Sequence, residues 1–195
     1  MPISEWVLRE ACGQLIRWNQ QYSDMIPLVI SINLFSRQLL QTNFVRVVKQ
    51  VLKETGIDAN NIMIDITESM IMDNTKIAAR VLKQLKTMKI QLAIDDFGTG
   101  YSSLGYIRKF PADLLKIDRS FISRMNDDEE SLGIVRAVIT MARNLGLKVI
   151  AEGVETAEQL KQLRTLGCDY GQGFYFSQPL DSQEVEHILK KKPTW

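Results

Sequence analysis

Polar side chains occur at or just beyond the end of each of six apolar segments that the sequence predicts to be strands. They are, in chain order, Asn33; Asp65 and Glu68; Asp95 and Asp96; Lys116 and Asp118; Glu152 and Glu155; and Gln172. One polar residue at a strand end is common and has no implication, whereas six in succession indicate a shared site. In a βα-barrel such positions converge on the face where the loops after the strands form active sites.

The adjacent carboxylates Asp95 and Asp96 are the most informative pair. Neighbouring strand side chains point to opposite faces, so both can serve one site only where the strand ends and the backbone turns. The segment from Phe97 through Gly98 and Thr99 to Gly100 can supply that turn. Clustered carboxylates with an amide oxygen are hard ligands that favour Mg²⁺ or Mn²⁺. Two such ions can clamp a phosphodiester displacement, and a lysine can stabilise charge on the phosphate or the attacking water.

Hydrophobic periodicity predicts the elements that position these residues. The predicted strands are Leu28–Leu34, Ile62–Thr67, Gln91–Asp95, Leu114–Asp118, Lys148–Glu152 and Asp169–Phe174. The predicted helices are Pro2–Tyr22, Asn43–Glu54, Thr75–Met88, Glu129–Leu145 and Ser182–Lys192. On the first helix we expect Trp6, Val7, Cys12, Leu15 and Ile16 to face the core.

This alternation predicts an α/β fold, and the strand ends favour a TIM-type βα-barrel in which six βα units are present. A closed barrel needs eight strands, so we expect the N-terminal strand or strands to be missing from the chain. An open doubly wound sheet also accommodates six parallel strands and stays an alternative. No linker interrupts residues 1–195, which are expected to form a single domain.

Composition narrows the class of protein. The 195 residues carry a formal net charge of +1, with 45% hydrophobic and 24% charged residues, as in ordinary globular proteins. This balance gives no global attraction to a DNA or RNA polymer or to an anionic membrane. Neither a signal peptide nor a stretch long enough to span a bilayer is evident. Cys12 and Cys168 lack metal-site spacing, so reduced thiols are expected, and His187 is assigned no chemistry.

Specific segments extend this interpretation. They are Ser31-Ile32-Asn33-Leu34, Asp65-Ile66-Thr67-Glu68-Ser69, the segment from Asp95 to Leu104 (DDFGTGYSSL), Leu115-Lys116-Ile117-Asp118-Arg119-Ser120, Ala151-Glu152-Gly153-Val154-Glu155-Thr156 and Gly171-Gln172-Gly173-Phe174. At these residues the whole chain closely resembles the EAL family of cyclic di-GMP phosphodiesterases. The DDFGTGYSSL segment alone is highly specific, and the order of the others makes coincidence implausible.

The resemblance implies a role for each matching residue. The metal ligands would be Asn33, Asp65, Asp95, Asp96 and Glu152. The catalytic residues would be Lys116, which contacts the nucleophilic water, and Glu152, which acts as a general base; Asp118 and Gln172 would form the site wall. The residues that anchor the loop after the third strand or couple it to dimerisation would be Glu68, Phe97, Gly98, Thr99, Gly100 and Glu155. The implied cofactor is Mg²⁺ or Mn²⁺ in a two-metal site.

Three features depart from the family pattern. The Glu-Ala-Leu segment, with a metal-binding glutamate and a nearby substrate-contacting arginine, would lie upstream of residue 1, so we expect an N-terminally truncated domain of a longer multidomain signalling protein. Asp65 is one methylene shorter than the usual glutamate, and Phe35 stands where a small serine is common. Because at least one ligand would be absent, the isolated chain is expected to have little or no activity.

Two functions from different classes follow. The first is metal-dependent hydrolysis of cyclic di-GMP to linear pGpG in the intact parent. The second is a catalytically inactive domain that binds cyclic di-GMP or a protein partner. Either version implies a bacterial cytoplasmic location, a homodimer, and a sensory or cyclase-like domain fused in the parent, without contact between this chain and a membrane or a nucleic-acid polymer. An unrelated six-stranded α/β domain is a third interpretation, which the order of the motifs opposes.

Overall fold

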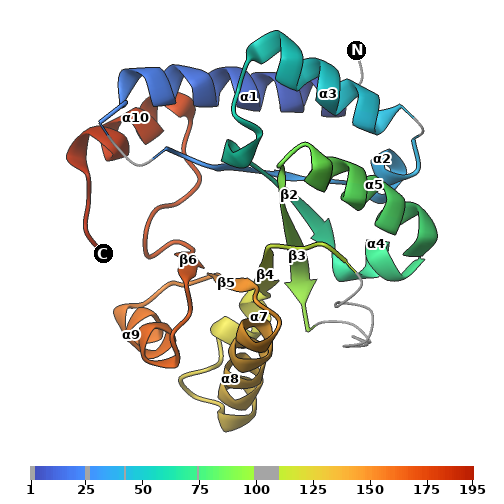
Figure 1. The fold of residues 1–195 in the computed structure, drawn as a ribbon. Coiled ribbons are helices and arrows are strands. Elements are labelled where there is room, and N and C mark those ends of the chain that lie inside the picture. The colour runs from blue at the N-terminus through green and yellow to red at the C-terminus, as the bar shows by residue number, and fades with distance from the viewer. Residues whose placement is uncertain (1–2, 25–26, 42, 74, 99–109) are drawn as a thin grey trace. The chain divides into compact units, whose positions relative to one another are not determined.

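The computed structural model describes residues 3–24, 27–41, 43–73, 75–98 and 110–195, in which strands and helices alternate along the chain (Figure 1). The strands in these ranges are β1 (Ile30–Asn33), β2 (Ile62–Thr67), β3 (Gln91–Phe97), β4 (Leu114–Ile117), β5 (Lys148–Glu152) and β6 (Tyr170–Gln172). The helices are α1 (Ile3–Gln21), α2 (Ser36–Leu39), α3 (Phe44–Thr55), α4 (Glu68–Asp73), α5 (Thr75–Thr87), α7 (Arg119–Ile122), α8 (Glu129–Asn144), α9 (Ala157–Leu166) and α10 (Ser182–Lys191), with a 3₁₀ turn, η1 (Ala59–Asn61).

The strands form one sheet in the order β1-β2-β3-β4-β5-β6. The β1–β2, β3–β4, β4–β5 and β5–β6 pairs are parallel. A doubly wound sheet reverses its strand order at a switch point, so this sequential order removes that alternative. The predicted α/β fold of the βα-barrel type with six strands is confirmed. β2 and β5 have their predicted bounds, β3 extends beyond Asp95 to Phe97, and the other three are shorter than predicted at one or both ends.

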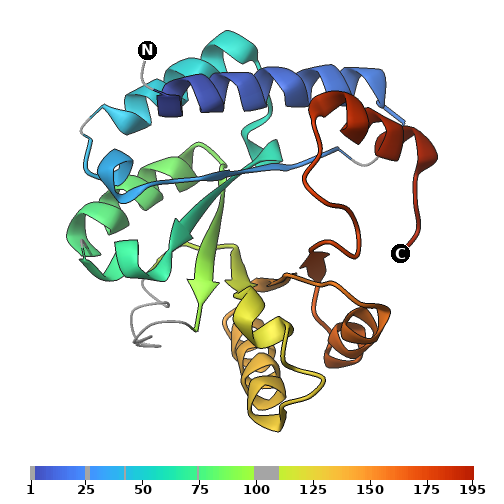
Figure 2. The same cartoon turned by 180° about the vertical axis from the view of Figure 1, so that it is seen from behind.

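The described chain divides into two compact units, residues 1–66, 70–92 and 181–194, and residues 67–69, 93–180 and 195. In the first unit α1 and α3 lie side by side (Figures 1 and 2). Cys12 and Leu15 on α1 and Val48 and Val51 on α3 are buried, because apolar residues three or four apart share one face of a helix. β1 pairs with β2 in this unit, with Asn33 in register with Asp65.

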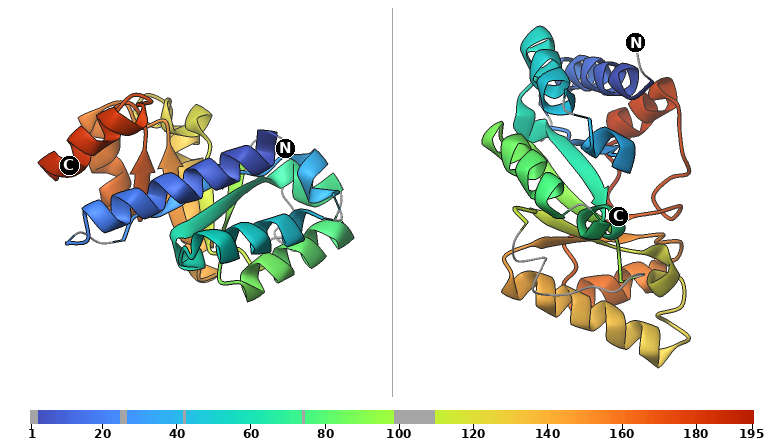
Figure 3. Two further views of the ribbon diagram at one scale, coloured as in Figure 1. Left: turned by 90° about the horizontal axis from the view of Figure 1, so that it is seen from above. Right: turned by 90° about the vertical axis from the view of Figure 1, so that its right-hand side faces the viewer.

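The second unit contains most of β3, all of β4, β5 and β6, and helices α7, α8 and α9. α8 packs against β4 and β5 and against the short helix α7, and Figure 3 shows these elements from two further directions. All four residues of β4 are buried, as expected of an inner strand of a parallel sheet. Lys116 is therefore a charged residue within an otherwise apolar buried strand.

Four helices were missed in the sequence analysis, and two side chains were placed wrongly. The helices α2, α4, α7 and α9 were not predicted. The first three are shorter than two turns and have too few residues for a periodic pattern. On α1 the side chains of Trp6 and Val7 are exposed, Trp6 at 52%, although we expected them in the core. The buried positions Leu8, Cys12 and Leu15 follow a spacing of four and three, which turns Trp6 and Val7 away from α3. No helix in the described ranges combines the length and apolarity that crossing a bilayer requires.

Candidate metal centre

A β-bulge at the end of β3 brings the two adjacent aspartates to one site. Ile94 is in register with Leu115, but Phe97 is in register with Ile117, so β3 carries one residue more than β4 over this stretch. Asp96 has φ of 54°, in the left-handed region that few residues other than glycine adopt, and its N–H donates to Asp95 Oδ1 at 3.0 Å. The backbone thus turns at Asp96 itself, earlier than the Phe97-to-Gly100 turn that the sequence suggested.

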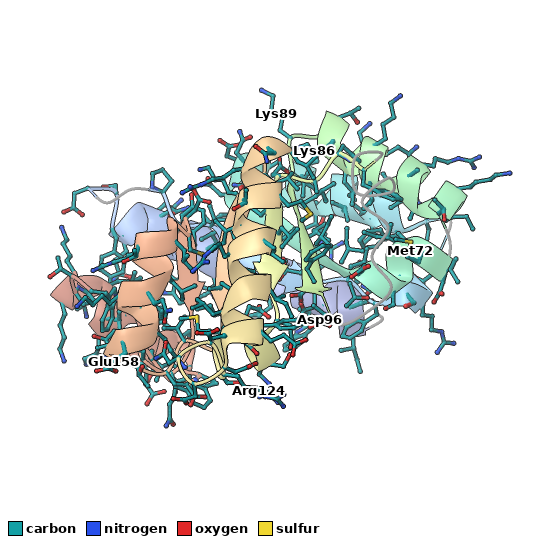
Figure 4. All side chains as sticks on the ribbon, turned by 90° about the horizontal axis from the view of Figure 1, so that it is seen from below. Met72, Lys86, Lys89, Asp96, Arg124 and Glu158 are labelled. Carbon is teal, nitrogen blue, oxygen red and sulfur yellow. The ribbon has the colours of Figure 1, made fainter. Side chains whose placement is uncertain are left out.

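The charged side chains at the carboxyl ends of β3, β4 and β5 form a cluster. Carboxylate oxygens of Asp95, Asp96 and Glu152 lie within 4.8 Å of one another. Lys116 on the intervening strand β4 places its Nζ 2.5 Å from Glu152 Oε1 and 3.3 Å from Asp95 Oδ1. Lys116 is in register with Ile150, two residues before Glu152, so the lysine and the glutamate share one face of the sheet. Figure 4 labels Asp96 at the carboxyl end of β3.

The electrostatics of the cluster favour a bound cation. Partial burial raises the pKa of Asp96 above its usual value, the nearby Asp95 and Asp118 carboxylates raise it further, and Lys116 opposes them. Lys116 is only 5% exposed and its ammonium sits between two carboxylates, so it provides the neutralising charge in this arrangement. A divalent ion near these oxygens would relieve the remaining repulsion.

The donor set fits a hard divalent metal. Mg²⁺ binds oxygens at about 2.1 Å in an octahedron, so opposite ligands are about 4.2 Å apart. Neighbouring ligands of such an ion are about 3.0 Å apart. The oxygens of Asp95, Asp96 and Glu152 lie within 4.8 Å of one another, so small side-chain rotations would bring them to the spacing of neighbouring or opposite ligands. All three donors are carboxylate oxygens, which suit Mg²⁺ or Mn²⁺, whereas most zinc and copper sites include thiolate or imidazole ligands.

Two other predicted ligands, Asn33 and Asp65, belong to the first unit. Asn33, the last residue of β1, is in register with Asp65, two residues before the end of β2; Asn33 is exposed and Asp65 is only 4% exposed. Ser31 donates its hydroxyl to Asp65 Oδ1 at 2.5 Å, and Leu34 donates its N–H to the Asp65 main-chain oxygen at 2.8 Å. The Ser31 contact was not predicted, and one aspartate oxygen is therefore already engaged by a neighbour.

The predicted wall residues occupy the ends of β4 and β6. Asp118 accepts a hydrogen bond from the Ser120 N–H at 2.9 Å and so caps α7, which gives its carboxylate a structural role as well. Gln172 is in register with Glu152, and its main-chain oxygen accepts from the Val154 N–H at 3.0 Å. The Gln172 side chain is exposed. The geometry thus places Gln172 beside the Glu152 strand end.

Glu68, at the start of α4, has a buried carboxylate whose oxygens lack hydrogen-bond donors among the described residues. It is 6% exposed, and neither of its side-chain oxygens has a hydrogen-bond partner within the described part of the chain. Burying an unpartnered carboxylate is costly, so this position calls for a donor or a cation. The partner that sequence analysis suggested lies in the loop after β3, and its members Thr99 and Gly100 are outside the described residues. The other two members, Phe97 and Gly98, are described; Phe97 is buried.

Gln159 fixes the loop that follows Glu152, and sequence analysis missed it. Its Oε1 accepts from the main-chain N–H groups of Glu155 at 2.7 Å and Thr156 at 3.1 Å, and its Nε2 donates to the Ile122 carbonyl at 3.2 Å. Thr156 in turn accepts from the Gln159 N–H, which completes a capping box at the start of α9. The Thr-x-x-Gln spacing was visible in the sequence and could have located both α9 and this anchor.

Replacing Gln159 with Leu should lower the free energy of unfolding by about 2 kcal/mol, because one buried and two part-buried main-chain groups lose their partner. Urea denaturation followed by circular dichroism measures the change. The matched control is Gln162→Leu, a half-buried glutamine on the same helix, which should stay within about 0.5 kcal/mol of the unaltered chain. Equal losses in the two variants would contradict the anchoring role.

Comparison with known proteins identifies the family. The EAL domain family model matches residues 1–179, and the chain therefore belongs to the EAL domain family. It is 38% identical over 186 residues to MucR of Pseudomonas aeruginosa, named a bifunctional diguanylate cyclase/cyclic di-GMP phosphodiesterase, covering 95% of this chain and 27% of MucR. The chain spans about a quarter of the length of the curated relatives it matches.

Solved structures of EAL proteins have the same fold as this chain. The MucR phosphodiesterase in complex with cyclic di-GMP has a TM-score of 0.89 at 38% identity, over 94% of this chain and 73% of that one. The EAL domain of Mycobacterium smegmatis DcpA also has a TM-score of 0.89 at 38% identity, over 97% and 84%. A calcium and cyclic di-GMP complex of Klebsiella pneumoniae BlrP1 has a TM-score of 0.80 at 28% identity, over 90% and 44%.

Proposed function

We propose that this domain hydrolyses cyclic di-GMP to linear pGpG with Mg²⁺ or Mn²⁺. The observation that carries the proposal is the cluster of Asp95, Asp96 and Glu152 oxygens around the Lys116 ammonium at adjoining strand ends. Family membership, the cyclic di-GMP complex of MucR and the calcium-containing complex of BlrP1 support the choice of substrate and of a divalent ion.

Each residue of the cluster has a role in this proposal. Asp95, Asp96 and Glu152 hold the cation, with Asn33 and Asp65 as further oxygen donors. The bound ion supplies Lewis-acid stabilisation of phosphoryl charge and lowers the pKa of water. Lys116 donates hydrogen bonds to the attacking water or a phosphoryl oxygen, and Glu152 accepts the proton of that water. The water oxygen forms a bond to phosphorus as the bond to the 3′ oxygen breaks. The 3′ oxygen leaves with the electron pair of that bond and takes up a proton from solvent, so the linear product carries a 5′-phosphate and a 3′-hydroxyl.

The remaining predicted residues support the site. Asp118 and Gln172 are proposed to form its wall. Glu68 is proposed to anchor the loop after β3, and its unpartnered buried oxygens are the observation in favour. We further propose that Phe97, Gly98, Thr99, Gly100 and Glu155 take part in anchoring this loop or coupling it to a homodimer. The parent is proposed to be a cytoplasmic signalling protein, and the double activity in the name of MucR supports a fused cyclase-like domain.

Direct binding and turnover measurements test the proposal. The 195-residue chain should bind Mn²⁺ in isothermal titration calorimetry, and cyclic di-GMP binding is measured on the same sample. Hydrolysis is followed by chromatography of pGpG, on this chain and on a chimera that adds the part of the MucR phosphodiesterase domain outside the matched region. Metal-dependent pGpG formation by the chimera, abolished by EDTA, is the expected result. A chimera that binds Mn²⁺ and nucleotide but forms no product would overturn the hydrolytic proposal.

A second candidate is a domain that binds cyclic di-GMP without cleaving it. The Asp65 geometry favours it, because this short carboxylate is buried and already accepts a hydrogen bond from Ser31. Restoring the longer side chain separates the candidates. Asp65→Glu in the chimera would raise turnover from a negligible level if Asp65 has silenced the site, whereas an already active chimera excludes the silent interpretation.

A further inference from the structure

The short helix α7 contacts the loops that follow both neighbouring strands of the metal centre. A Cβ placed on Gly98, just after β3, would lie 2.9 Å from Cε2 of Phe121, so the ring rests against the Gly98 backbone. A Cβ on Gly153, just after β5, would lie 2.5 Å from Cβ of Arg119. Such approaches leave no room for a side chain at either glycine. One turn of helix therefore meets the segments that carry Asp96 and Glu152.

The segment under Phe121 has an unusual backbone. Asp96 has φ of 54° and Gly98 has φ of 98°, so two positive φ values occur within three residues. A left-handed conformation at a residue other than glycine costs of order 1 kcal/mol and persists only where the surroundings enforce it. The Phe121 ring is a rigid surface in contact with that segment.

The position of the Phe121 ring is itself fixed. Asp118 caps α7 through the Ser120 N–H, the Ile122 side chain is fully buried, and the Ile122 carbonyl accepts from Gln159 Nε2 at 3.2 Å. Phe121 lies between these two fixed points and is only partly buried. Its ring can therefore limit the movement of the turn at the end of β3, although Phe121 is not a central core residue.

We propose that Phe121 is a positioning residue that holds the Asp95–Asp96 turn in the conformation able to bind the cation. The proposal rests on the proposed metal-dependent function. Phe121 touches no reacting group and acts through Gly98. Without the ring, the turn can relax to ordinary negative φ values, which moves the Asp96 carboxylate away from Asp95 and Glu152. The loss then appears in metal affinity.

Mn²⁺ titration of the 195-residue chain tests the proposal. Phe121→Ala should raise the Mn²⁺ dissociation constant about tenfold, the lower end of the effect of losing groups that support metal ligands. Phe121→Leu, which retains an apolar surface against Gly98, should recover most of the affinity. The matched control is Phe110→Ala, which removes a buried ring before the amino end of β4 and should leave the Mn²⁺ affinity unchanged. Unchanged affinity in Phe121→Ala, or an equal loss in Phe110→Ala, overturns the proposal.

A double-mutant cycle tests the contact independently of metal. Gly98→Ala introduces a methyl group into the ring and also strains φ, whereas only the first effect disappears when Phe121 is Ala. Gly98→Ala should therefore shift the urea midpoint less in the Phe121→Ala background than in the unaltered chain. Additive shifts overturn the proposal. If the unaltered chain binds no Mn²⁺, the proposed function fails, and this cycle still decides whether Phe121 supports the turn.

Discussion

In the chimera that adds the part of the MucR phosphodiesterase domain outside the matched region, replacing Lys116 with Met should lower the proposed cyclic di-GMP hydrolysis by roughly 10²–10³-fold, the range for removal of one preorganised donor from a reaction centre. The same change should strengthen Mn²⁺ binding. In the metal-free protein the ammonium lies 2.5 Å from Glu152 and 3.3 Å from Asp95, and so it competes with a cation for the same oxygens. Opposite signs for turnover and affinity distinguish a catalytic lysine from one that only maintains the fold.

The stability of the metal-free protein should fall at the same time. Removing one partner from a buried ion pair costs about 3–5 kcal/mol, but Asp95 and Glu152 stay 14% and 18% exposed, so a loss of about 2 kcal/mol is expected. Saturating Mn²⁺ should restore the stability, since the ion replaces the lost positive charge. Urea denaturation with and without Mn²⁺ measures both effects.

Lys148→Met is the control for the lysine variant. Lys148 is exposed at the amino end of β5 and donates to the Tyr170 hydroxyl at 2.9 Å, away from the carboxylates at the other end of that strand. It should change neither Mn²⁺ affinity nor turnover of the chimera. A Lys116→Met protein that hydrolyses cyclic di-GMP at the unaltered rate would refute the role assigned to Lys116.

Asp96→Asn should weaken Mn²⁺ binding at least about 100-fold, because loss of a supporting partner alone costs 10–100-fold and this change removes a ligand charge. In the absence of metal it should stabilise the fold. Asn tolerates the left-handed conformation that residue 96 adopts, and the neutral amide removes repulsion with Asp95 and Asp118. A loss of metal affinity together with a gain in stability is the result expected if Asp96 is a metal ligand, since residues of functional sites often oppose stability.

The stabilisation by Asp96→Asn should depend on pH in a definite direction. The pKa of Asp96 is raised in the folded protein, so its ionised form opposes folding at neutral pH, whereas its protonated form does not. The gain in urea midpoint should therefore be largest near neutral pH and should vanish as pH falls through the raised pKa. Asp127→Asn, an exposed position in the same unit, serves as the control and should show neither effect. A gain that persists at low pH would assign the stabilisation to another cause.

The sequence predicted the strands well because a buried parallel strand is a short, continuous apolar run. β2 and β5 were located to the residue, and the polar groups after each strand identified Asp95, Asp96, Lys116 and Glu152 as candidates. Short helices were missed, since a single turn such as α7 has no periodicity. The anchor Gln159 was not predicted although its capping-box spacing was present, because the bond of its neutral amide to Ile122 spans 37 residues and leaves no local pattern.

The sequence by itself determined the family, the positions of the strands along the chain and the kinds of atoms available for a metal. Those properties depend on residue types and on their separation along the chain. Only the tertiary structure showed that carboxylate oxygens of the adjacent Asp95 and Asp96 lie close together, because the extra residue in β3 relative to β4 is a property of the pairing between strands. It also decided that Lys116 lies between Asp95 and Glu152, and that Phe121 rests on Gly98. Contacts between residues far apart in sequence arise from packing, which local patterns do not encode.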